Sequence, residues 1–243
     1  MIDKGLYVAM SGAQSNFDRL ARTTNNLANA DTQGFRAEFL ATRALNTQGP
    51  SLNTRAFASE IAPGTNFATG SVQQTGKALD VAIVGKGWLS VNGANGAEAL
   101  TRGGSLKVDS EGYLTTTGGL KVIGDGGPIS IGNATNVQIA SDGTISGIQD
   151  GGKVALLGQL KLSNPDEKNL VRGDDGLFRT KKGGIEADPS VRLATGSLEG
   201  SNVNVIEEMT RMVELSRQFD LNVKVMQTAD ANSKQISSLL NLS

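Results

Sequence analysis

The sequence contains no cysteine and no histidine among its 243 residues. Their absence excludes thiolate nucleophiles, Ser-His-Asp triads, disulfides and zinc sites with imidazole or thiolate ligands. Aromatic residues make up only 4% of the chain, and the formal net charge is -1. The sequence therefore has neither the aromatic residues for base stacking nor the excess of positive charge that would indicate a nucleic-acid partner. We expect that the protein has no cofactor and no nucleic-acid partner. We also expect that it recognises its partners by shape and apolar contact.

Long apolar runs are also missing. The longest purely aliphatic runs have four residues, as in Val81 to Val84. The first residues include Asp3 and Lys4 but no apolar segment typical of a secretory signal. We therefore expect neither a cleaved Sec-type signal nor insertion into a membrane.

Glycine is abundant but unevenly distributed. Of the 31 glycines, only Gly5 and Gly12 precede Gly34, and residues 201–243 contain neither glycine nor proline. Because glycine and proline are the strongest helix breakers, this distribution predicts a helix at each end and a turn-rich middle.

In the first segment, apolar or small residues recur in alternating steps of four and three: Leu6, Met10, Ala13, Phe17, Leu20, Thr24 and Leu27. This spacing is typical of a seam between packed helices. Asn25, Asn26 and Asn29 are poor helix formers, so we expect the helix to end between residues 29 and 34.

The last segment is predicted to begin at Asn204, an N-cap residue with Glu207 three positions later. The same steps follow through Val205, Met209, Met212, Ser216, Phe219, Val223 and Met226, and then one position out of phase through Ala229, Ser233, Ile236 and Leu240. The pattern predicts a helix of roughly 35 to 40 residues. Leu221 and Val225 lie nearly opposite this stripe, so one partner helix would not cover all its apolar sides.

Residues 79–195 alternate apolar and polar side chains in short segments, separated by turn pairs such as Asn95-Gly96, Asp142-Gly143, Asp150-Gly151 and Asp175-Gly176. These features predict an antiparallel all-β domain. The fold class is thus α+β, with a terminal helix pair that resembles a coiled coil. We expect four parts: an N-terminal helix (1–33), an extended connector (34–78), the β domain (79–195) and a C-terminal helix (196–243). Heptads alone do not distinguish a helical hairpin packed on the β domain from helices that assemble with other subunits.

Two chemical hypotheses concern the middle segment: phosphate binding, and the binding or cleavage of carbohydrate. The glycine-rich loops lack the spacing of a phosphate-binding motif. A carbohydrate-active or carbohydrate-binding protein would need facing carboxylates or an aromatic platform. Most acids here stand beside glycine, where turn formation explains them, and Trp88 suits a core position in an apolar strand.

Two segments resemble the flagellar basal-body rod and hook protein family. Residues 25–35, NNLANADTQGF, are similar to its N-terminal signature, and residues 198–203, LEGSNV, followed by Glu208-Met209, are similar to its C-terminal one. The motif residues are Asn25, Asn26, Leu27, Ala28, Asn29, Gly34, Phe35, Ser201, Asn202 and Val203.

This resemblance implies a structural subunit of the flagellar rod, of the proximal-rod type, with the distal-rod type as the alternative. It implies export by the flagellar type III apparatus, other rod subunits as partners, and a location in the periplasmic part of the basal body. It also implies polymerisation through the terminal helices, without enzymatic activity. The expected assembly interface consists of Leu6, Met10, Ala13, Phe17, Leu20, Leu27, Val205, Met209, Met212, Phe219, Val223, Met226, Ile236 and Leu240.

Overall fold

A computed structural model describes residues 2–40, 42–46, 56–60, 64–149, 152–181 and 183–240. The chain forms two compact units. Unit 1 comprises Met1–Ala30, Ala37–Asn66 and Val203–Ser243, and unit 2 comprises Asp31–Arg36 and Phe67–Asn202. The chain therefore passes between the units at residues 30/31, 36/37, 66/67 and 202/203.

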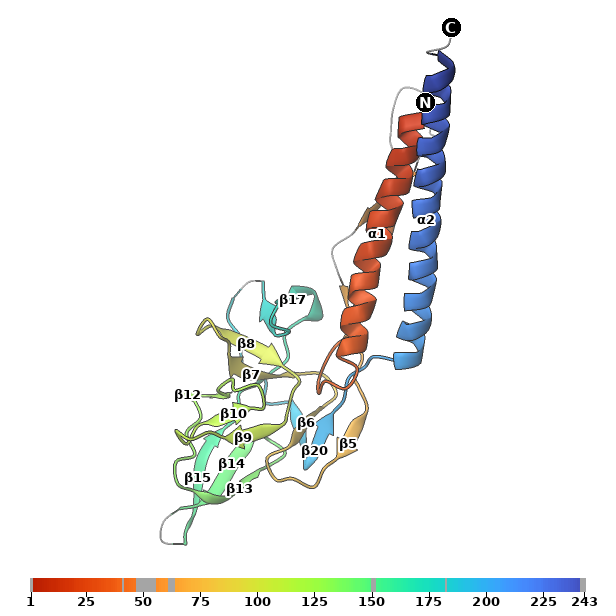
Figure 1. The fold of residues 1–243 in the computed structure, drawn as a ribbon. Coiled ribbons are helices and arrows are strands. Elements are labelled where there is room, and N and C mark those ends of the chain that lie inside the picture. The colour runs from red at the N-terminus through yellow and green to blue at the C-terminus, as the bar shows by residue number, and fades with distance from the viewer. Residues whose placement is uncertain are drawn as a thin grey trace. The chain divides into compact units, whose positions relative to one another are not determined.

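Unit 1 is built around two long helices, α1 (Ile2–Ala28) and α2 (Val205–Leu240), which lie side by side and run in opposite directions (Figure 1). The α2 helix has 36 residues, within the predicted length. The Asn204 side-chain oxygen accepts hydrogen bonds from the backbone N–H groups of Ile206 at 3.2 Å and Glu207 at 3.3 Å, so the predicted N-cap is confirmed. Within the described part of the chain, neither helix is apolar enough over a sufficient length to span a membrane.

Four short strands complete unit 1. The strand β1 (Glu38–Phe39) pairs with β4 (Gly64–Thr65), and β2 (Thr42–Asn46) pairs with β3 (Ala56–Glu60), both antiparallel. These strands lie in the stretch that we predicted to be an extended connector, residues 34–78. That stretch contributes to both units, since β5 (Val72–Gln74) belongs to unit 2.

Unit 2 contains the remaining strands, whose pairings are antiparallel. They are β5 (Val72–Gln74), β6 (Val81–Val84), β7 (Trp88–Asn92), β8 (Glu98–Thr101), β9 (Leu106–Val108), β10 (Leu114–Thr116), β11 (Ile123–Gly124), β12 (Gly127–Pro128), β13 (Thr135–Ile139), β14 (Thr144–Ile148), β15 (Val154–Gln159), β16 (Leu162–Ser163), β17 (Leu170–Arg172), β18 (Phe178–Thr180), β19 (Arg192–Thr195) and β20 (Ser197–Glu199), with a short 3-10 helix at Glu167–Asn169. The largest sheet has the order β16-β7-β8-β18-β17, and a second has the order β13-β14-β15. The prediction of an antiparallel β region between two helices is confirmed.

The turns of unit 2 follow the predicted residue pairs. Gly96, Gly143 and Gly176 have φ angles of 73°, 87° and 76°, a backbone conformation that glycine adopts without strain. A fourth predicted pair, Asp150-Gly151, lies outside the described residues. Turn chemistry thus accounts for part of the high glycine content.

The core of unit 2 is formed by the inward-facing residues of these strands. Val91, Leu100 and Leu114 are fully buried. Trp88 is 4% exposed, and its ring packs against Phe67 and Phe178 with centroid separations of 6.1 and 4.6 Å. The interpretation of Trp88 as a core residue is therefore confirmed, and its ring is not available as an open binding platform.

Candidate assembly surface and motif clusters

The face that α1 buries consists mainly of small and polar residues. Ala9, Ala13, Asn16 and Thr23 are buried, and Leu20 is half-buried. Their spacing of 4, 3, 4 and 3 residues is that of a helix–helix seam. Small side chains on this face allow the two helices to approach closely. A Cβ built on Gly12 would make an ordinary van der Waals contact with α2, 3.6 Å from the Asn222 amide nitrogen.

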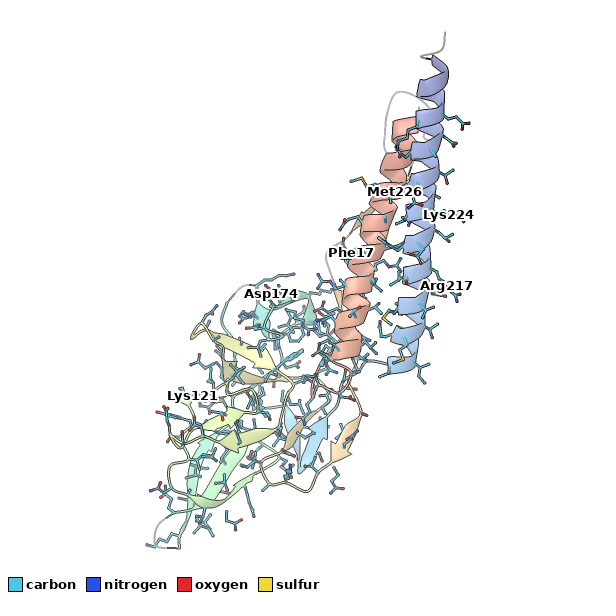
Figure 2. All side chains as sticks on the ribbon, in the orientation of Figure 1. Phe17, Lys121, Asp174, Arg217, Lys224 and Met226 are labelled. Carbon is cyan, nitrogen blue, oxygen red and sulfur yellow. The ribbon has the colours of Figure 1, made fainter. Side chains whose placement is uncertain are left out.

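The buried face of α2 has the same spacing. Glu208 and Leu215 are buried, and the other positions of this spacing, Met212, Phe219, Asn222 and Met226, are half-buried. Arg217 and Lys224 lie on the opposite side of α2 and point away from α1 (Figure 2). The seam within one copy therefore contains only some of the residues in the predicted stripe.

The predicted interface residues divide by exposure. Ala13 is buried, and half-buried side chains are those of Leu20, Leu27, Met212, Phe219, Val223 and Met226. Exposed side chains are those of Met10 (62%), Phe17 (56%), Val205 (38%) and Met209 (48%). The side chains of Leu6, Ile236 and Leu240 lie outside the described part of the structure. The seam between α1 and α2 thus leaves several of the largest predicted interface residues in solvent.

Other sides of α2 are apolar as well. Ile206 is 78% exposed, Val213 49%, Leu221 63% and Val225 55%. Leu221 and Val225 border an open groove together with Lys224, Thr228, Ala229 and Asn232. These exposed residues agree with the expectation that α2 has apolar groups on more than one side.

A buried asparagine from the N-terminal motif connects three segments of unit 1. Asn26 is 1% exposed. Its amide nitrogen donates to the Glu38 carbonyl oxygen at 2.8 Å and to Glu208 Oε1 at 3.3 Å, and its oxygen accepts from the Glu38 backbone N–H at 2.8 Å. Arg22 pairs with the Glu38 carboxylate at 2.7 Å, and Arg211 donates to Glu208 at 3.2 Å. We call Arg22, Asn26, Glu38, Glu208 and Arg211 the Asn26 cluster.

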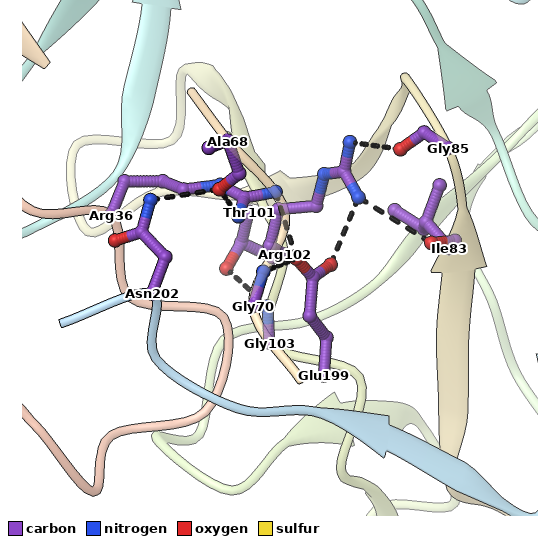
Figure 3. Close-up of polar contacts among 10 residues, drawn as sticks. All are labelled: Arg36, Ala68, Gly70, Ile83, Gly85, Thr101, Arg102, Gly103, Glu199 and Asn202. Carbon is purple, nitrogen blue, oxygen red and sulfur yellow. Dashed lines mark hydrogen bonds and ion pairs between the residues drawn. The ribbon is translucent and has the colours of Figure 1, made fainter. Parts of the chain in front are cut away.

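Unit 2 contains a second polar cluster, in which the Glu199 carboxylate lies between two arginines (Figure 3). Glu199 Oε1 is 2.8 Å from Arg36 Nη2, and Oε2 is 2.9 Å from Arg102 Nη1. The side chains of Arg36, Glu199 and Arg102 are 0%, 1% and 4% exposed. Burial lowers the pKa of both guanidinium groups, and the charge of Glu199 opposes that shift. We call Arg36, Arg102 and Glu199 the Glu199 cluster.

The motif residues of unit 2 surround the Glu199 cluster. The Gly34 N–H donates to the Glu199 carbonyl oxygen at 2.9 Å, and the Asn202 N–H donates to the Phe35 carbonyl oxygen at 3.3 Å. The Asn202 amide nitrogen donates to the Ala68 carbonyl oxygen at 2.7 Å, as Figure 3 shows. Ser201, next to Asn202, is half-buried, and so is Val203, with which the last segment of unit 1 begins. Residues from the two terminal motifs therefore meet, although more than 160 positions separate them in sequence.

The remaining N-terminal motif residues lie in unit 1. Asn25 and Ala28 are exposed, and the Asn29 amide nitrogen donates to the Asn25 carbonyl oxygen at 2.9 Å, near the end of α1. Leu27 is half-buried. The motif thus places one asparagine in a buried cluster and another at the exposed helix end.

The two clusters were not predicted as groups. Asn26 and Glu199 belong to the motifs quoted above, but sequence gives no sign that Asn26 is buried while Asn25 is exposed. Arg36 directly follows the Gly34-Phe35 turn, and Arg102 precedes a Gly-Gly pair. Because charged residues beside other turn glycines, such as Asp142 and Asp175, form only turns, no local sequence signal distinguishes the residues of these clusters.

The acids that stand beside glycine act as turn residues. Asp142 Oδ1 accepts from the Thr144 N–H at 3.0 Å, and Asp175 Oδ1 accepts from the Leu177 N–H at 3.2 Å. The Arg179 guanidinium lowers the pKa of the Asp175 carboxyl by hydrogen bonding to it. Among the residues that the structure describes, no three acidic side chains gather as a metal site requires. The turn interpretation of these acids is therefore confirmed at both positions.

Comparison with protein families gives three matches along the chain. Residues 6–36 match the model described as flagella basal body rod protein, and residues 82–147 match the flagellar hook protein FlgE/F/G D1 domain. Residues 194–239 match the flagellar basal body rod FlgEFG protein C-terminal model. The first and last matches contain the two motif segments.

Individual relatives are similar over their full lengths. The flagellar basal-body rod protein FlgF of Escherichia coli K12 is 40% identical over 252 residues, covering 100% of both chains. FlgF of Salmonella typhimurium is 41% identical with the same coverage. The flagellar basal-body rod protein FlgG of Agrobacterium fabrum is 29% identical, covering 98% of this chain and 99% of the relative.

Proposed function

The chain belongs to the family of flagellar basal-body rod proteins, and we propose that it polymerises through its two terminal helices. It is a structural subunit of the bacterial flagellar basal-body rod, which is also its location. Identities of 40% and 41% to two FlgF relatives, against 29% to a FlgG relative, support a position in the proximal rod. A distal-rod position is the alternative.

The observation that supports assembly through the helices is the exposure of large apolar side chains on both of them. Phe17 of α1 is 56% exposed, and Ile206 and Leu221 of α2 are 78% and 63% exposed. Full burial of one such side chain contributes about 1.5–3 kcal/mol. Neighbouring subunits that cover several of these residues would therefore gain substantial stability, whereas an isolated chain gains nothing from them.

In this proposal the helix pair of each subunit acts as a coiled-coil-like unit. The seam uses the heptad spacing around Ala13 and Leu215, and the outer sides provide contacts to neighbours. The acid-first ion pairs Glu207–Arg211 and Asp230–Lys234, both at 2.8 Å, form polar strips between the apolar sides of α2. A rod built this way transmits torque through many shared helix contacts and performs no enzymatic reaction.

The partners in this proposal are other flagellar rod subunits, together with the flagellar type III export apparatus during secretion. The proposed rod segments are residues 1–33, which contain α1, and residues 196–243, which contain α2; the proposed β domain is residues 79–195 and the proposed connector residues 34–78. Family membership supports contacts with rod subunits. The absence of cysteine is compatible with export of an unfolded chain, since no premature disulfide can form.

The experiment replaces one exposed apolar residue on each helix with an acid. Phe17→Asp and Met209→Asp are produced in cells that lack the wild-type subunit, and basal bodies are examined by electron microscopy. We expect the β domain to fold and rod growth to stop, because an unpaired charge in a dry interface costs several kcal/mol. Thr210→Asp and Asn25→Asp place the same charge at exposed polar positions of α2 and α1 and are expected to permit rod growth.

Immunoblots of the periplasmic fraction separate failed assembly from failed export. The expected result is that both helix variants reach the periplasm but do not enter rods. Complete rods and normal motility with both helix variants would contradict assembly through these residues. Loss of rods with Thr210→Asp alone would show that charge anywhere on α2 is sufficient, and would contradict it as well.

A further inference from the structure

We infer that the Glu199 cluster is a clasp that fixes the chain segments by which unit 2 is joined to unit 1. This inference rests on the proposed function for its consequence under torque, but not for its local structural effect. Unit 2 is joined to unit 1 next to residues 31, 36, 67 and 202. Arg36, Gly34 and Gly70, which contact Glu199, come from segments that end at these residues, whereas Arg102 comes from the sheet.

Glu199 is the residue that connects these segments. Its side-chain Oε1 accepts the Gly70 N–H at 3.0 Å and lies 2.8 Å from Arg36 Nη2. Its backbone carbonyl accepts the Gly34 N–H at 2.9 Å. One residue of β20 thus binds two segments of unit 2: the first, at residues 34–36, and the one with which the chain returns to unit 2, at residue 70.

The second arginine joins this arrangement to the sheet. Arg102, just after β8, pairs with Glu199 Oε2 at 2.9 Å and donates to the carbonyl oxygen of Gly85 at 2.7 Å. Its guanidinium carbon also lies 5.4 Å from the centre of the Trp88 ring, in the core of unit 2. The clasp therefore connects the linking segments to the packed interior, as Figure 3 shows for its polar contacts.

The charges make the closed state depend on one carboxylate. Two buried guanidinium groups face a single buried acid, so the cluster has a net positive charge. Without the acid, Arg36 would retain the Ala68 carbonyl, and Arg102 would retain carbonyl oxygens, as uncharged partners. Removing one partner of a buried ion pair is strongly destabilising because an uncompensated charge remains. Loss of the Glu199 charge should therefore open the clasp, rather than only weaken it.

Close backbone packing prevents these segments from shifting separately. A Cβ on Gly70 would lie 2.1 Å from the Gly200 carbonyl oxygen, and a Cβ on Gly34 would lie 2.4 Å from the Arg102 carbonyl carbon. Two glycines thus allow backbone segments to touch around the buried charges. In a rod under torque, the chain segments that link the two units carry force from one unit to the other. The clasp holds these segments together.

The test measures hydrogen exchange in the full chain with Glu199→Gln, which keeps the shape of the side chain and removes its charge. The amide hydrogens of Gly34 and Gly70, which donate to Glu199, are compared with those of core strands β7 and β10. We expect exchange at Gly34 and Gly70 to accelerate on the order of 100-fold while exchange in the core strands changes little. Glu98→Gln, which breaks the half-buried pair with Lys161, is the matched control and should leave Gly34 and Gly70 protected.

A neutral triple variant tests whether charge is the cause. Arg36→Met, Arg102→Met and Glu199→Gln together remove all three charges and keep an acceptor oxygen for the Gly70 N–H, so protection at Gly34 and Gly70 should return. If Glu199→Gln fails to fold, Glu199→Asp is measured instead, since its shorter carboxylate cannot reach both arginines at the present distances. The clasp is refuted if, in Glu199→Gln and Glu199→Asp, the exchange rates of the Gly34 and Gly70 amides change by the same factor as those of the core strands.

Cells provide the readout under load. With Glu199→Gln we expect complete rods, because the helices are unchanged, but slower swimming in a viscous medium than with Glu98→Gln. Equal swimming in a viscous medium would contradict a role of the clasp in force transmission. Failure of the proposed function is distinguishable, because it would appear as normal rods in the helix variants described above.

Discussion

The most direct test of the motif interpretation is the replacement of Asn26 by leucine. Asn26 is 1% exposed. Its side-chain amide donates to the carbonyl oxygen of Glu38 and accepts from the N–H of Glu38, each at 2.8 Å, as a neighbouring β-strand would. It also donates to Glu208 at 3.3 Å. Leucine has the same branching and the same number of side-chain heavy atoms but can make none of these three bonds. The change therefore removes polar contacts without creating a large cavity.

The expected cost follows from the groups that lose their partner. Each buried polar group that loses its hydrogen bond costs about 1–3 kcal/mol. Two backbone groups of Glu38 are affected, while the Glu208 carboxylate keeps Arg211 at 3.2 Å. The apolar leucine side chain recovers part of the loss when it is buried. We expect a net loss of about 2–4 kcal/mol in the stability of unit 1.

Hydrogen exchange at the Glu38 amide measures this loss locally, and thermal unfolding measures it globally. The matched control is Asn25→Leu at the neighbouring exposed position, for which we expect a change within about 0.5 kcal/mol. If Asn26→Leu and Asn25→Leu had the same small effect, the reasoning from buried hydrogen bonds would be wrong. If both were equally destabilising, a cause shared by the two positions at the end of α1, and not the buried hydrogen bonds of Asn26, would be responsible.

Two further predictions concern unit 2. Gly34→Ala should lower the thermal stability of unit 2 by more than Gly119→Ala, since both have positive φ but only Gly34 lies against the Arg102 backbone, with nothing within 4 Å of Gly119; equal effects would show that backbone conformation alone is responsible. The pKa of Asp175, lowered by Arg179, should rise in Arg179→Gln when it is followed by NMR. Because the folded-state pKa is depressed, this pair stabilises the fold above the unfolded pKa of about 4, and the contribution is lost as the pH falls through the folded pKa. An unchanged Asp175 titration in Arg179→Gln would contradict that cause.

Local signals in the sequence predicted most of the secondary structure. The helix cap at Asn204, the end of α1 after Ala28 and the turn glycines depend on neighbouring residues only. The same local rules explain why the acids Asp142 and Asp175 form turns rather than a site. Such features need no knowledge of distant parts of the chain.

The face that each helix buries could not be predicted in the same way. Apolarity favours Met10 and Phe17 as seam residues, yet they are exposed, while Ala9 and Asn16 are buried. Small side chains bring two helix backbones closer together, and that depends on the partner helix. A stripe of large apolar residues therefore indicates contact with some partner without identifying which one.

Long-range pairing is the second limit of sequence reasoning. Arg36 and Glu199 are in contact at 2.8 Å, and Asn26 and Glu208 at 3.3 Å, although each pair joins opposite ends of the chain. Nothing in the spacing of either motif states which of its polar residues is buried. In the structure, residues of the N-terminal motif contact residues of the C-terminal motif. The structural role of a single motif residue can therefore be assigned only when its partner in the other motif is known.

The contact between the two motifs also predicts a coupling free energy between Asn26 and Glu208. If Asn26 and Glu208 stabilise unit 1 through their direct contact at 3.3 Å, the double variant Asn26→Leu with Glu208→Leu should be less destabilised than the sum of the single variants. We expect a coupling of about 1 kcal/mol, since residues in one hydrogen-bond network typically couple by 0.5–3 kcal/mol. Asn25→Leu combined with Glu208→Leu is the control and should be additive within about 0.5 kcal/mol, because Asn25 is exposed. Additive behaviour of the Asn26 pair would mean that the two motifs are independent, and that the hydrogen bond between them contributes nothing measurable.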